Sequence, residues 1–579
     1  MGTSRRVEDN QEMNMENRKI VVIGGSAAGA KAAARARRLD PQAEITIIQK
    51  SPDLSMASCG YPYYVGGTFG ERSQLLATPT GVVRDPQFFQ KTKNIRAITE
   101  TECVRIDRDN KQVACRNLQS GDEFVESYDK LVLATGASAN LLPIAGRELI
   151  GVTTFLTMQD TDFLHDRSVS GEVKRAVVIG GGLIGVEACE ALRSRGIEVT
   201  LVELEKQVLT FLDLQLGMLV GNHMRSKGVE LRTGMKLERF VGEDGKLTGV
   251  QLANGETLEC QLAVMATGVR PNVEIAAAAG LEIGTLGGLA VNASMQTSDP
   301  DIYAAGDCVE CTHLLTGKKT YAPMGDLANL QGRVVGENVV EGNVATFPGT
   351  IQTVICKVFD FGAGATGLSE RTARAQGMTD IETVVNASPD KPGFMGAKLL
   401  ISKLLVEKST GRILGYQCVG SGDVSRQLAT AAMAVRGKLT LAELCCADLP
   451  YAPPYSLAID HFIASAHIMD NKLKGRLKTI TAEEVHARIE AGNPPCFIDG
   501  RGPDEHEVLR LGIGEKYIPL GMIRNVLADL PQDKATEIVC FCKISLRGYE
   551  LARILEGYGY TNVKVMEGGI MAWPFSRER

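Results

Sequence analysis

The sequence predicts an α/β protein of several domains, and three observations lead to this fold class. A β-like run, a glycine-rich turn, a helix and a second strand begin at Lys19, and the same order begins again at Arg175. The chain has 579 residues, too many for one hydrophobic core. From Ile480 a further alternation of helices and strands covers about 100 residues, long enough to fold independently.

Composition narrows the class of protein. A hydrophobic share of 44% and a charged share of 23% are typical of globular proteins, and the formal net charge of -6 excludes a generally basic surface, so no nucleic-acid partner is expected. Fourteen cysteines in a chain of this length fit a reducing compartment. There is no secretory leader pattern and no apolar run of membrane-spanning length, so we predict a cytoplasmic protein without a membrane partner. Residues 1–18 are polar and unpatterned and are predicted to be a disordered tail.

The first repeat departs from the ideal phosphate-binding pattern. Its strand covers Lys19–Ile23, its turn runs from Gly24 to Gly29, and its helix ends at Leu39. Ser26 takes the place of the second glycine of the pattern. A strand at 44–48 follows, and Gln49 stands where an acidic residue is expected; an amide can still bond a ribose hydroxyl.

The second repeat matches the pattern closely. A strand at 175–179 leads into Gly180-x-Gly182-x-x-Gly185, followed by a helix at 186–195 and a strand at 198–202. Glycines permit the tight turn, and the helix N-terminus attracts a pyrophosphate. Glu203 ends the next strand, where a carboxylate accepts hydrogen bonds from a ribose 2′-hydroxyl and repels a 2′-phosphate. NADH is therefore favoured over NADPH.

Three further segments complete a resemblance. Residues 131–136 and 263–268 both end in Ala-Thr-Gly, and residues 302–307 form a buried strand that ends in Gly-Asp. Across residues 19–468 the chain resembles the pyridine nucleotide–disulfide oxidoreductases. The resemblance implies that the first loop binds FAD and the second NAD(P)H. It assigns to cofactor binding Gly24, Ser26, Gly29, Gln49, Ala134, Thr135, Gly136, Gly180, Gly182, Gly185, Glu203, Gly268, Gly306 and Asp307.

A single cysteine follows the second strand. In this family the cysteine that matches Cys59 lies beside the flavin. Members with two cysteines have the second one five residues later, where this chain has Tyr64. Cys59 must therefore pair its sulfur with something that is brought in, which can be a substrate thiol, a persulfide or a peroxide, and its thiolate is the reactive form. The segment resembles the single-cysteine coenzyme A-disulfide and persulfide reductases.

A basic helix face supports that resemblance. Lys31, Arg35 and Arg38 follow the spacing i, i+4, i+7 and share one face of the first helix. On spacing alone this is as well explained by a solvated face as by a binding surface. In the resembled reductases the matching positions, with Ser55 and Ser58, line the coenzyme A site.

Two tyrosines and the absence of a histidine bear on the reaction. In the resembled reductases a tyrosine near the end of the flavoprotein part acts beside the cysteine of the partner subunit, which implies a homodimer; Tyr451 is the first candidate and Tyr455 the second. A second family tyrosine, expected near Gly393, is missing, which weakens the case for coenzyme A disulfide more than for a persulfide.

Peroxidases and NADH oxidases of this fold place a histidine in the first loop, but here no histidine precedes His165.

The C-terminal unit, from residue 480, resembles a rhodanese domain. Cys542 leads a six-residue loop between a strand and a helix, where backbone N–H groups and the helix dipole favour a thiolate or persulfide anion. Arg547 adds positive charge, and Asp499-Gly500-Arg501 stands where such domains carry Asp-x-Arg.

In the flavoprotein part, Cys308, Cys311 and His313 suggest a metal site, but packing is the favoured interpretation and no metal is expected.

The predicted architecture is two Rossmann-like FAD/NAD(P)-binding domains, an α+β dimerisation domain and a C-terminal rhodanese-like α/β domain. The expected boundaries are 19–150 and 287–345 for FAD, 151–286 for NAD(H), 346–468 for dimerisation, 469–479 for a linker and 480–579 for rhodanese. The predicted activity is NADH- and FAD-dependent reduction of a persulfide, polysulfide, or coenzyme A persulfide or disulfide by Cys59, with Cys542 carrying sulfane sulfur. The alternatives are an NADH peroxidase or oxidase that cycles a Cys59 sulfenic acid, and a sulfurtransferase with a non-catalytic flavin domain.

Overall fold

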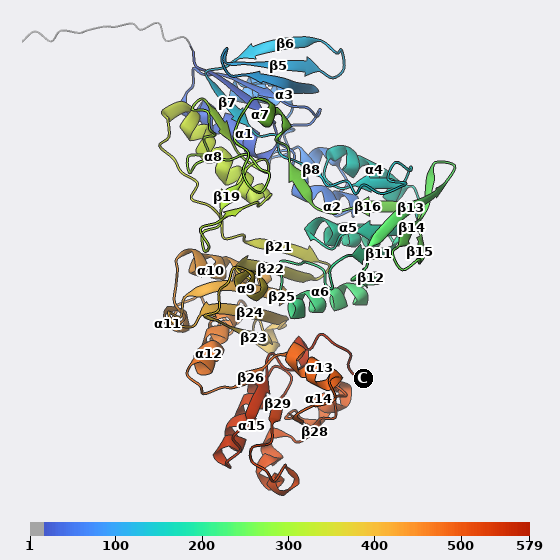
Figure 1. Cartoon of the computed structure of the whole chain (residues 1–579), viewed down its shortest axis with the longest axis vertical. Coiled ribbons are helices and arrows are strands. Elements are labelled where there is room, and N and C mark those ends of the chain that lie inside the picture. The colour runs from blue at the N-terminus through green and yellow to red at the C-terminus, as the bar shows by residue number, and fades with distance from the viewer. Residues whose placement is uncertain (1–16, 579) are drawn as a thin grey trace, which may run out of the picture.

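A computed structural model describes residues 17–578, so most of the predicted tail lies outside the described residues (Figure 1). The first domain is built on a parallel sheet in the order β18-β7-β1-β2-β3. Its strands are β1 (Lys19–Ile23), β2 (Glu44–Ile48), β3 (Arg96–Ile98), β7 (Lys130–Leu133) and β18 (Ile302–Ala304). Helices α1 (Ala27–Leu39) and α8 (Gly325–Glu341) pack on each other. The central strands β1, β2 and β7 consist mainly of Ile, Val and Leu because both faces of the sheet are covered.

The chain returns to this first domain earlier than the sequence predicts. Antiparallel strands β4 (Thr101–Asp107), β5 (Gln112–Asn117) and β6 (Glu123–Ser127) form a meander beside the sheet. Helix α7 (Glu274–Ala278) packs on β4, and Ala276 and Leu281 are buried in the same core as β1. Residues 274–286 therefore pack with the first domain, although the sequence analysis placed them in the second.

The second domain has the same plan. Its parallel sheet, in the order β12-β11-β10-β16-β9, uses β9 (Val152–Thr154), β10 (Arg175–Ile179), β11 (Glu198–Glu203), β12 (Val229–Thr233) and β16 (Leu262–Met265). Its helices are α4 (Met158–Val169), α5 (Leu183–Ser194) and α6 (Leu214–Ser226), and a meander of β13 (Leu237–Glu243), β14 (Lys246–Leu252) and β15 (Thr257–Glu259) flanks them. Helix α5 begins three residues before the predicted start, because Gly182 is its N-cap.

The two Ala-Thr-Gly segments meet where the chain crosses between these domains. Strand β8 (Ala137–Ala139) pairs antiparallel with β17 (Val269–Pro271). The Thr135 hydroxyl donates to the Asn272 carbonyl at 2.6 Å, and the Thr267 hydroxyl donates to the Asn140 carbonyl at 2.7 Å. The sequence repeat thus corresponds to a symmetrical crossing that fixes the two domains to each other.

The third domain is an antiparallel sheet in the order β21-β22-β25-β24-β23. The strands are β21 (Val354–Val358), β22 (Phe361–Gly367), β23 (Ile381–Pro389), β24 (Leu399–Glu407) and β25 (Ile413–Gly420), and the helices are α9 (Glu370–Ala375), α10 (Val424–Arg436), α11 (Leu441–Cys445) and α12 (His461–Leu473). Helix α12 continues to Leu473 because Met469 is fully buried in this core. The first residues of the predicted linker are therefore helical.

The fourth domain is a parallel sheet in the order β26-β30-β29-β27-β28, at the far end of the molecule from the β4–β6 meander (Figure 1). Its strands are β26 (Thr479–Ile480), β27 (Cys496–Asp499), β28 (Lys516–Tyr517), β29 (Ile538–Phe541) and β30 (Val563–Met566), and its helices are α13 (Ala482–Glu490), α14 (Pro503–Val508) and α15 (Leu546–Gly557). Ala572, Met571 and Ile544 share one apolar cluster with α6 and strands β23–β25. The domain is therefore docked on the second and third domains.

Candidate active site

The two glycine loops are packed so closely that larger residues would not fit. Gly24 has a φ of +101°, and a Cβ there would lie 2.1 Å from the Ala134 carbonyl oxygen. A Cβ on Gly29 would lie 1.8 Å from the Gly24 carbonyl oxygen, and Gly185 repeats this contact with Gly180 at 1.9 Å. A Cβ on Gly182, in contrast, would meet nothing within 4 Å, so this position stays open to a ligand. Ser26 caps α1 without a side-chain hydrogen bond, which leaves its hydroxyl free at the helix N-terminus.

Gln49 and Glu203 occupy equivalent positions in the two domains. The Gln49 side-chain oxygen accepts a hydrogen bond from the Gly25 N–H at 2.7 Å, and the Glu203 carboxylate accepts one from the Gly181 N–H. The Gln49 amide nitrogen donates to the Ser51 hydroxyl and the Asp53 carbonyl. Each side chain therefore ties its strand to its glycine loop and keeps acceptor capacity for a ribose hydroxyl.

Asp307 fits the role that the resemblance implies for it. It follows β18 and Gly306, whose N–H donates to the Gln331 side chain. Its carboxylate accepts no hydrogen bond from the residues that the structure describes, and burial raises its pKa to about 6. A partly buried carboxylate without a donor is costly, and a hydroxyl-rich chain such as the ribityl group of FAD would supply one. The residues around the first loop therefore fit FAD.

Cys59 lies at the N-terminus of α8. It is an exposed residue in a short 3-10 turn (Ser58–Gly60), and its Sγ is 3.5 Å from the position that a Cβ on Gly325 would take. Desolvation raises the pKa of the Cys59 thiol, and the carboxylates of Glu187 and Asp307 raise it further. The expected thiolate therefore draws no net stabilisation from the protein's charged side chains.

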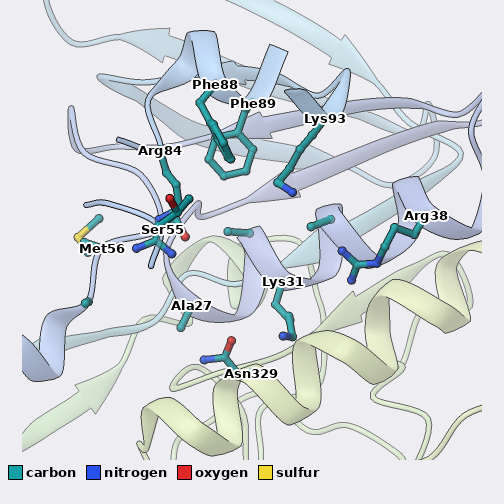
Figure 2. A pocket seen from close by; sticks show the side chains of 14 residues that line it. Ala27, Lys31, Arg38, Ser55, Met56, Arg84, Phe88, Phe89, Lys93 and Asn329 are labelled. Carbon is teal, nitrogen blue, oxygen red and sulfur yellow. The ribbon is translucent and has the colours of Figure 1, made fainter. Parts of the chain in front are cut away.

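A cavity of about 440 Å³ lies beside α1, and residues 55–57, which precede Cys59 in the chain, form part of its lining. Figure 2 shows Lys31 and Arg38 on α1, with Lys93 and Phe88 across the space and Ser55 at one end. The cavity has four cations that form no ion pair with any carboxylate among residues 17–578; they are Lys31, Arg38, Arg84 and Lys93. Unpaired cations beside an aromatic wall suit a ligand that carries both phosphates and a flat ring.

Two predicted residues of this surface lie elsewhere. The Arg35 guanidinium forms an ion pair with Glu337 of α8 at 2.6 Å, so it joins two helices. Ser58 is in the turn with Cys59 and does not line the cavity. Arg84, in contrast, lines it, although it follows Cys59 by 25 positions and no periodicity connects it to α1.

Glu187 and Tyr63 are a pair that sequence reasoning missed. Desolvation raises the pKa of the Glu187 carboxyl to about 7, and the nearby carboxylate of Glu190 raises it further, while the nearby Tyr63 hydroxyl lowers it. Tyr63 is on α2 (Tyr61–Val65), and Glu187 is on α5, two residues after Gly185. Glu187 could have been noticed in the sequence, because it is an acidic residue in an otherwise apolar stretch of the predicted helix.

The two candidate tyrosines lie on a loop between α11 and α12. The side chain of Tyr451 is 54% exposed and that of Tyr455 is 73% exposed. Among the described residues, neither hydroxyl hydrogen-bonds to Cys59 or to any other group. Both rings are available to a second chain.

The Cys542 loop is closed by its surroundings. Cys542 is fully buried after β29, and its carbonyl accepts from the Ile570 N–H at 3.0 Å. Arg547 lies within hydrogen-bond reach of the Cys542 sulfur but also forms a two-point ion pair with Glu505. The arginine's charge is therefore shared between the thiol and a carboxylate.

The Asp-x-Arg segment supports that loop from behind. Asp499 and Arg501 form a buried ion pair at 2.7 Å. The Arg501 guanidinium also donates to the carbonyl of Glu505 within α14 and to that of Leu509, the C-cap of this helix. The pair thus positions α14, which carries the carboxylate partner of Arg547.

In residues 17–578 no helix is both long and apolar enough to cross a bilayer. The same residues contain no group of three or more His, Cys, Asp or Glu side chains arranged to hold a metal, and the Cys308 thiol instead faces the carbonyls of Leu133 and Ala305.

Three families match consecutive parts of the chain. Residues 18–328 match "Pyridine nucleotide-disulphide oxidoreductase", residues 353–462 match its dimerisation domain, and residues 481–574 match "Rhodanese-like domain". These matches confirm the predicted fold class.

Individual proteins resemble from about four fifths to nearly all of the chain. A solved NAD-dependent persulfide reductase from A. fulgidus is 41% identical, covers 96% of this chain and 100% of its own, and superposes with a TM-score of 0.91. An NADH oxidase from Methanocaldococcus jannaschii is 32% identical over 79% of this chain and its own full length. An NAD(P)H coenzyme A polysulfide/persulfide reductase from Pyrococcus horikoshii is 31% identical over 78% of this chain and 98% of its own.

Proposed function

The chain belongs to the pyridine nucleotide-disulphide oxidoreductase family, and from this premise we propose that it uses NADH to reduce a coenzyme A persulfide or a related persulfide at Cys59. The observation that carries the proposal is the cavity with four unpaired cations, which reaches Ser55, four residues before Cys59. Coenzyme A combines three phosphates, an adenine ring and a thiol on a long arm, so cations and an aromatic wall suit its nucleotide end. The names of the relatives from A. fulgidus and P. horikoshii support the same substrate class.

In the proposed reaction Cys59 is the nucleophile. Its sulfur attacks the S–S bond of the persulfide, forms a mixed disulfide with the organic thiol and releases hydrosulfide. Two electrons then cleave the mixed disulfide to the Cys59 thiolate and the free thiol. FAD, when bound, supplies the path by which the electron pair of NADH reaches this sulfur.

The chain's own residues set the conditions for these steps. Lys31, Arg38 and Arg84 hold the phosphates, so the pantetheine arm is directed toward Cys59. The N-terminus of α8 places backbone N–H groups and a positive dipole beside the sulfur. Glu203 favours NADH because its carboxylate would repel a 2′-phosphate.

The remaining parts of the proposal concern assembly and sulfur supply. We propose a homodimer, since the dimerisation domain exposes large apolar side chains such as Phe394, Met433 and Tyr455, each at least 70% accessible. We also propose a cytoplasmic location, because free cysteines fit a reducing compartment. Tyr451 or Tyr455 would then act as a proton donor at Cys59 of the other subunit. Cys542 would accept sulfane sulfur and pass it to coenzyme A.

One relative's name favours a second candidate, the NADH oxidase activity. Reduction of oxygen or peroxide at a cysteine requires a proton for the leaving oxygen. The charged groups around Cys59 are carboxylates, and no histidine is among them. A hydrosulfide leaves with less assistance because it is a weaker base, so the persulfide reaction fits these surroundings better.

The test compares substrates and variants side by side. NADH oxidation is measured with coenzyme A persulfide, coenzyme A disulfide and hydrogen peroxide, using the wild type, Cys59→Ser and Cys542→Ser at equal flavin content. We expect the persulfide to be the best substrate, Cys59→Ser to abolish turnover and Cys542→Ser to retain it. Faster oxidation by peroxide would favour the oxidase. Thiosulfate-to-cyanide transfer that survives Cys59→Ser, in a protein that does not oxidise NADH, would favour a sulfurtransferase.

A further inference from the structure

We propose that Arg426 is a positioning residue that holds the tyrosine loop, defined here as residues 451–460, in place to serve Cys59 of a second subunit. This inference rests on the proposed function, because it concerns the two tyrosines to which that function assigns proton donation. It adds a residue on a different element, α10, to which neither the motifs nor the family resemblance assigns a role.

Arg426 contacts the loop at two points. From the first turn of α10, one nitrogen of its guanidinium donates to the Tyr455 carbonyl oxygen at 2.7 Å. Another nitrogen forms an ion pair with Asp460, the last residue of the loop. A planar guanidinium with fixed donor directions constrains both points together, which the single ammonium of a lysine cannot do.

The Asp460 end of the loop is fixed by further contacts. Asp460 is 5% exposed, caps α12 through the Phe462 N–H at 2.9 Å and accepts a hydrogen bond from the Gln427 side chain at 3.1 Å. The next residue, His461, lies between the Ser388 hydroxyl at 2.6 Å and the Ser402 hydroxyl at 2.8 Å. These contacts attach the end of the loop to strands β23 and β24.

The tyrosine side chains are the free part of this loop. Tyr455 presents its carbonyl to Arg426 and its ring to solvent, and Tyr451 is likewise more than half exposed. A backbone anchored beneath exposed rings fits a loop that delivers them to a neighbouring molecule. Loss of the anchor should therefore leave binding intact and misplace the donor hydroxyl.

The experiment compares Arg426→Ala, Arg426→Lys and the control Arg436→Ala. Arg436 is an exposed arginine at the other end of α10, with no ion pair among the described residues. Turnover is measured with coenzyme A disulfide and coenzyme A persulfide, and flavin reduction by NADH is followed separately. The disulfide releases a thiolate, which is a stronger base than hydrosulfide, so its turnover depends more on a placed proton donor.

We expect Arg426→Ala to lower kcat about tenfold with the disulfide and about two- to threefold with the persulfide, because it weakens general acid catalysis without removing the donor. KM and the rate of flavin reduction should stay unchanged, Arg426→Lys should recover part of the loss, and Arg436→Ala should match the wild type. An equal loss with both substrates, or slower flavin reduction, would show a merely structural role and overturn the proposal.

A double-mutant cycle separates this inference from the proposed function. In a Tyr451→Phe, Tyr455→Phe background, Arg426→Ala should cause no further loss, since its effect passes through the tyrosines. A further loss would overturn the positioning role alone. If the two Tyr→Phe changes leave turnover untouched while Cys59→Ser abolishes it, both the tyrosine role and the positioning role are wrong, and the reductase activity still holds.

Discussion

A buried ion pair holds the rhodanese domain on the rest of the molecule, and its removal makes a quantitative prediction. Glu567, at the end of β30, is 1% exposed in its side chain and pairs with Lys472 of α12 at 2.8 Å. Its other oxygen accepts from the Val385 N–H of β23 at 2.8 Å. Lys472 also donates to the Thr383 carbonyl, so one ammonium joins α12, β23 and the fourth domain.

Replacing Lys472 with glutamine removes the cation, so the buried Glu567 carboxylate keeps only the Val385 N–H as a backbone donor. Breaking a buried pair in this way costs about 3–5 kcal/mol, and the 18% exposure of the Lys472 side chain favours the lower end of that range. At about 1.4 kcal/mol per tenfold change, a loss of about 3 kcal/mol raises the population of the undocked state roughly 100-fold. Desolvation lowers the pKa of Lys472, but Glu567 and Glu382 together raise it above its ordinary value, so this stability is fully present below the ordinary lysine range and is lost as pH rises through the raised pKa.

Limited proteolysis measures this population directly. Thermolysin cleaves before apolar residues, and Ile544, which packs with α6 and strands β23–β25 at the docking interface, becomes accessible when the domain undocks. We expect Lys472→Gln to be cleaved there roughly 100-fold faster than the wild type. The control is Lys474→Gln, which breaks only a surface pair with Asp470 on the same helix. Equal cleavage rates for the two variants would refute the reasoning, as would a Lys472→Gln, Glu567→Gln double variant that recovers nothing.

Three further predictions follow from the active site. Gly29→Ala should yield protein without bound FAD, measured by visible flavin absorbance, because its Cβ would lie 1.8 Å from the Gly24 carbonyl. Glu187→Gln should stabilise the FAD-free protein increasingly from pH 4 to pH 8, because the wild-type carboxyl, with its pKa raised to about 7, stays neutral in the fold while the unfolded chain ionises. At 1.36 kcal/mol per unit the gain is at most about 3 kcal/mol, less for residual solvation, and denaturant titrations at each pH would measure it. Arg84→Gln should raise KM for coenzyme A persulfide about tenfold, in steady-state kinetics, by removing a charge-assisted hydrogen bond.

Each of these has a matched comparison. Gly70→Ala should keep its flavin, since a Cβ there would meet nothing within 4 Å. A stabilisation by Glu187→Gln that does not change with pH would contradict the desolvation argument. Arg84→Gln should leave KM for a persulfide without phosphates unchanged, and Arg116→Gln, which breaks an exposed pair on β5, should change neither KM. An equal rise for both persulfides would contradict phosphate binding by Arg84.

Local sequence patterns were sufficient for much of the fold. Strands β1, β2 and β10 begin and end where their apolar runs predict, because buried parallel strands require unbroken apolar residues. The glycines at 24, 29, 180 and 185 were equally evident, since their backbone approaches exclude any side chain. Cys59 and Cys542 could be singled out because each sits in a short, recognisable segment, Cys59 in a turn after β2 and Cys542 directly after β29.

Contacts between distant segments could not be read in this way. Periodicity placed Arg35 with Lys31 and Arg38 on one face of α1, but Glu337, about 300 positions away, withdraws it into an ion pair. Arg84 enters the same cavity from a separate segment. The predicted start of the linker at residue 469 differs from the structure for a similar reason. Helix α12 continues past it because the third domain buries Met469.

The sequence by itself therefore determined the backbone plan, the two glycine loops and the two candidate cysteines, since each depends on residues that are neighbours along the chain. The tertiary structure alone decided which cations stay unpaired, how carboxylates raise the pKa of Cys59 and how the rhodanese domain docks. Charge and burial depend on every group within a few ångströms, and the fold brings those groups together from all four domains.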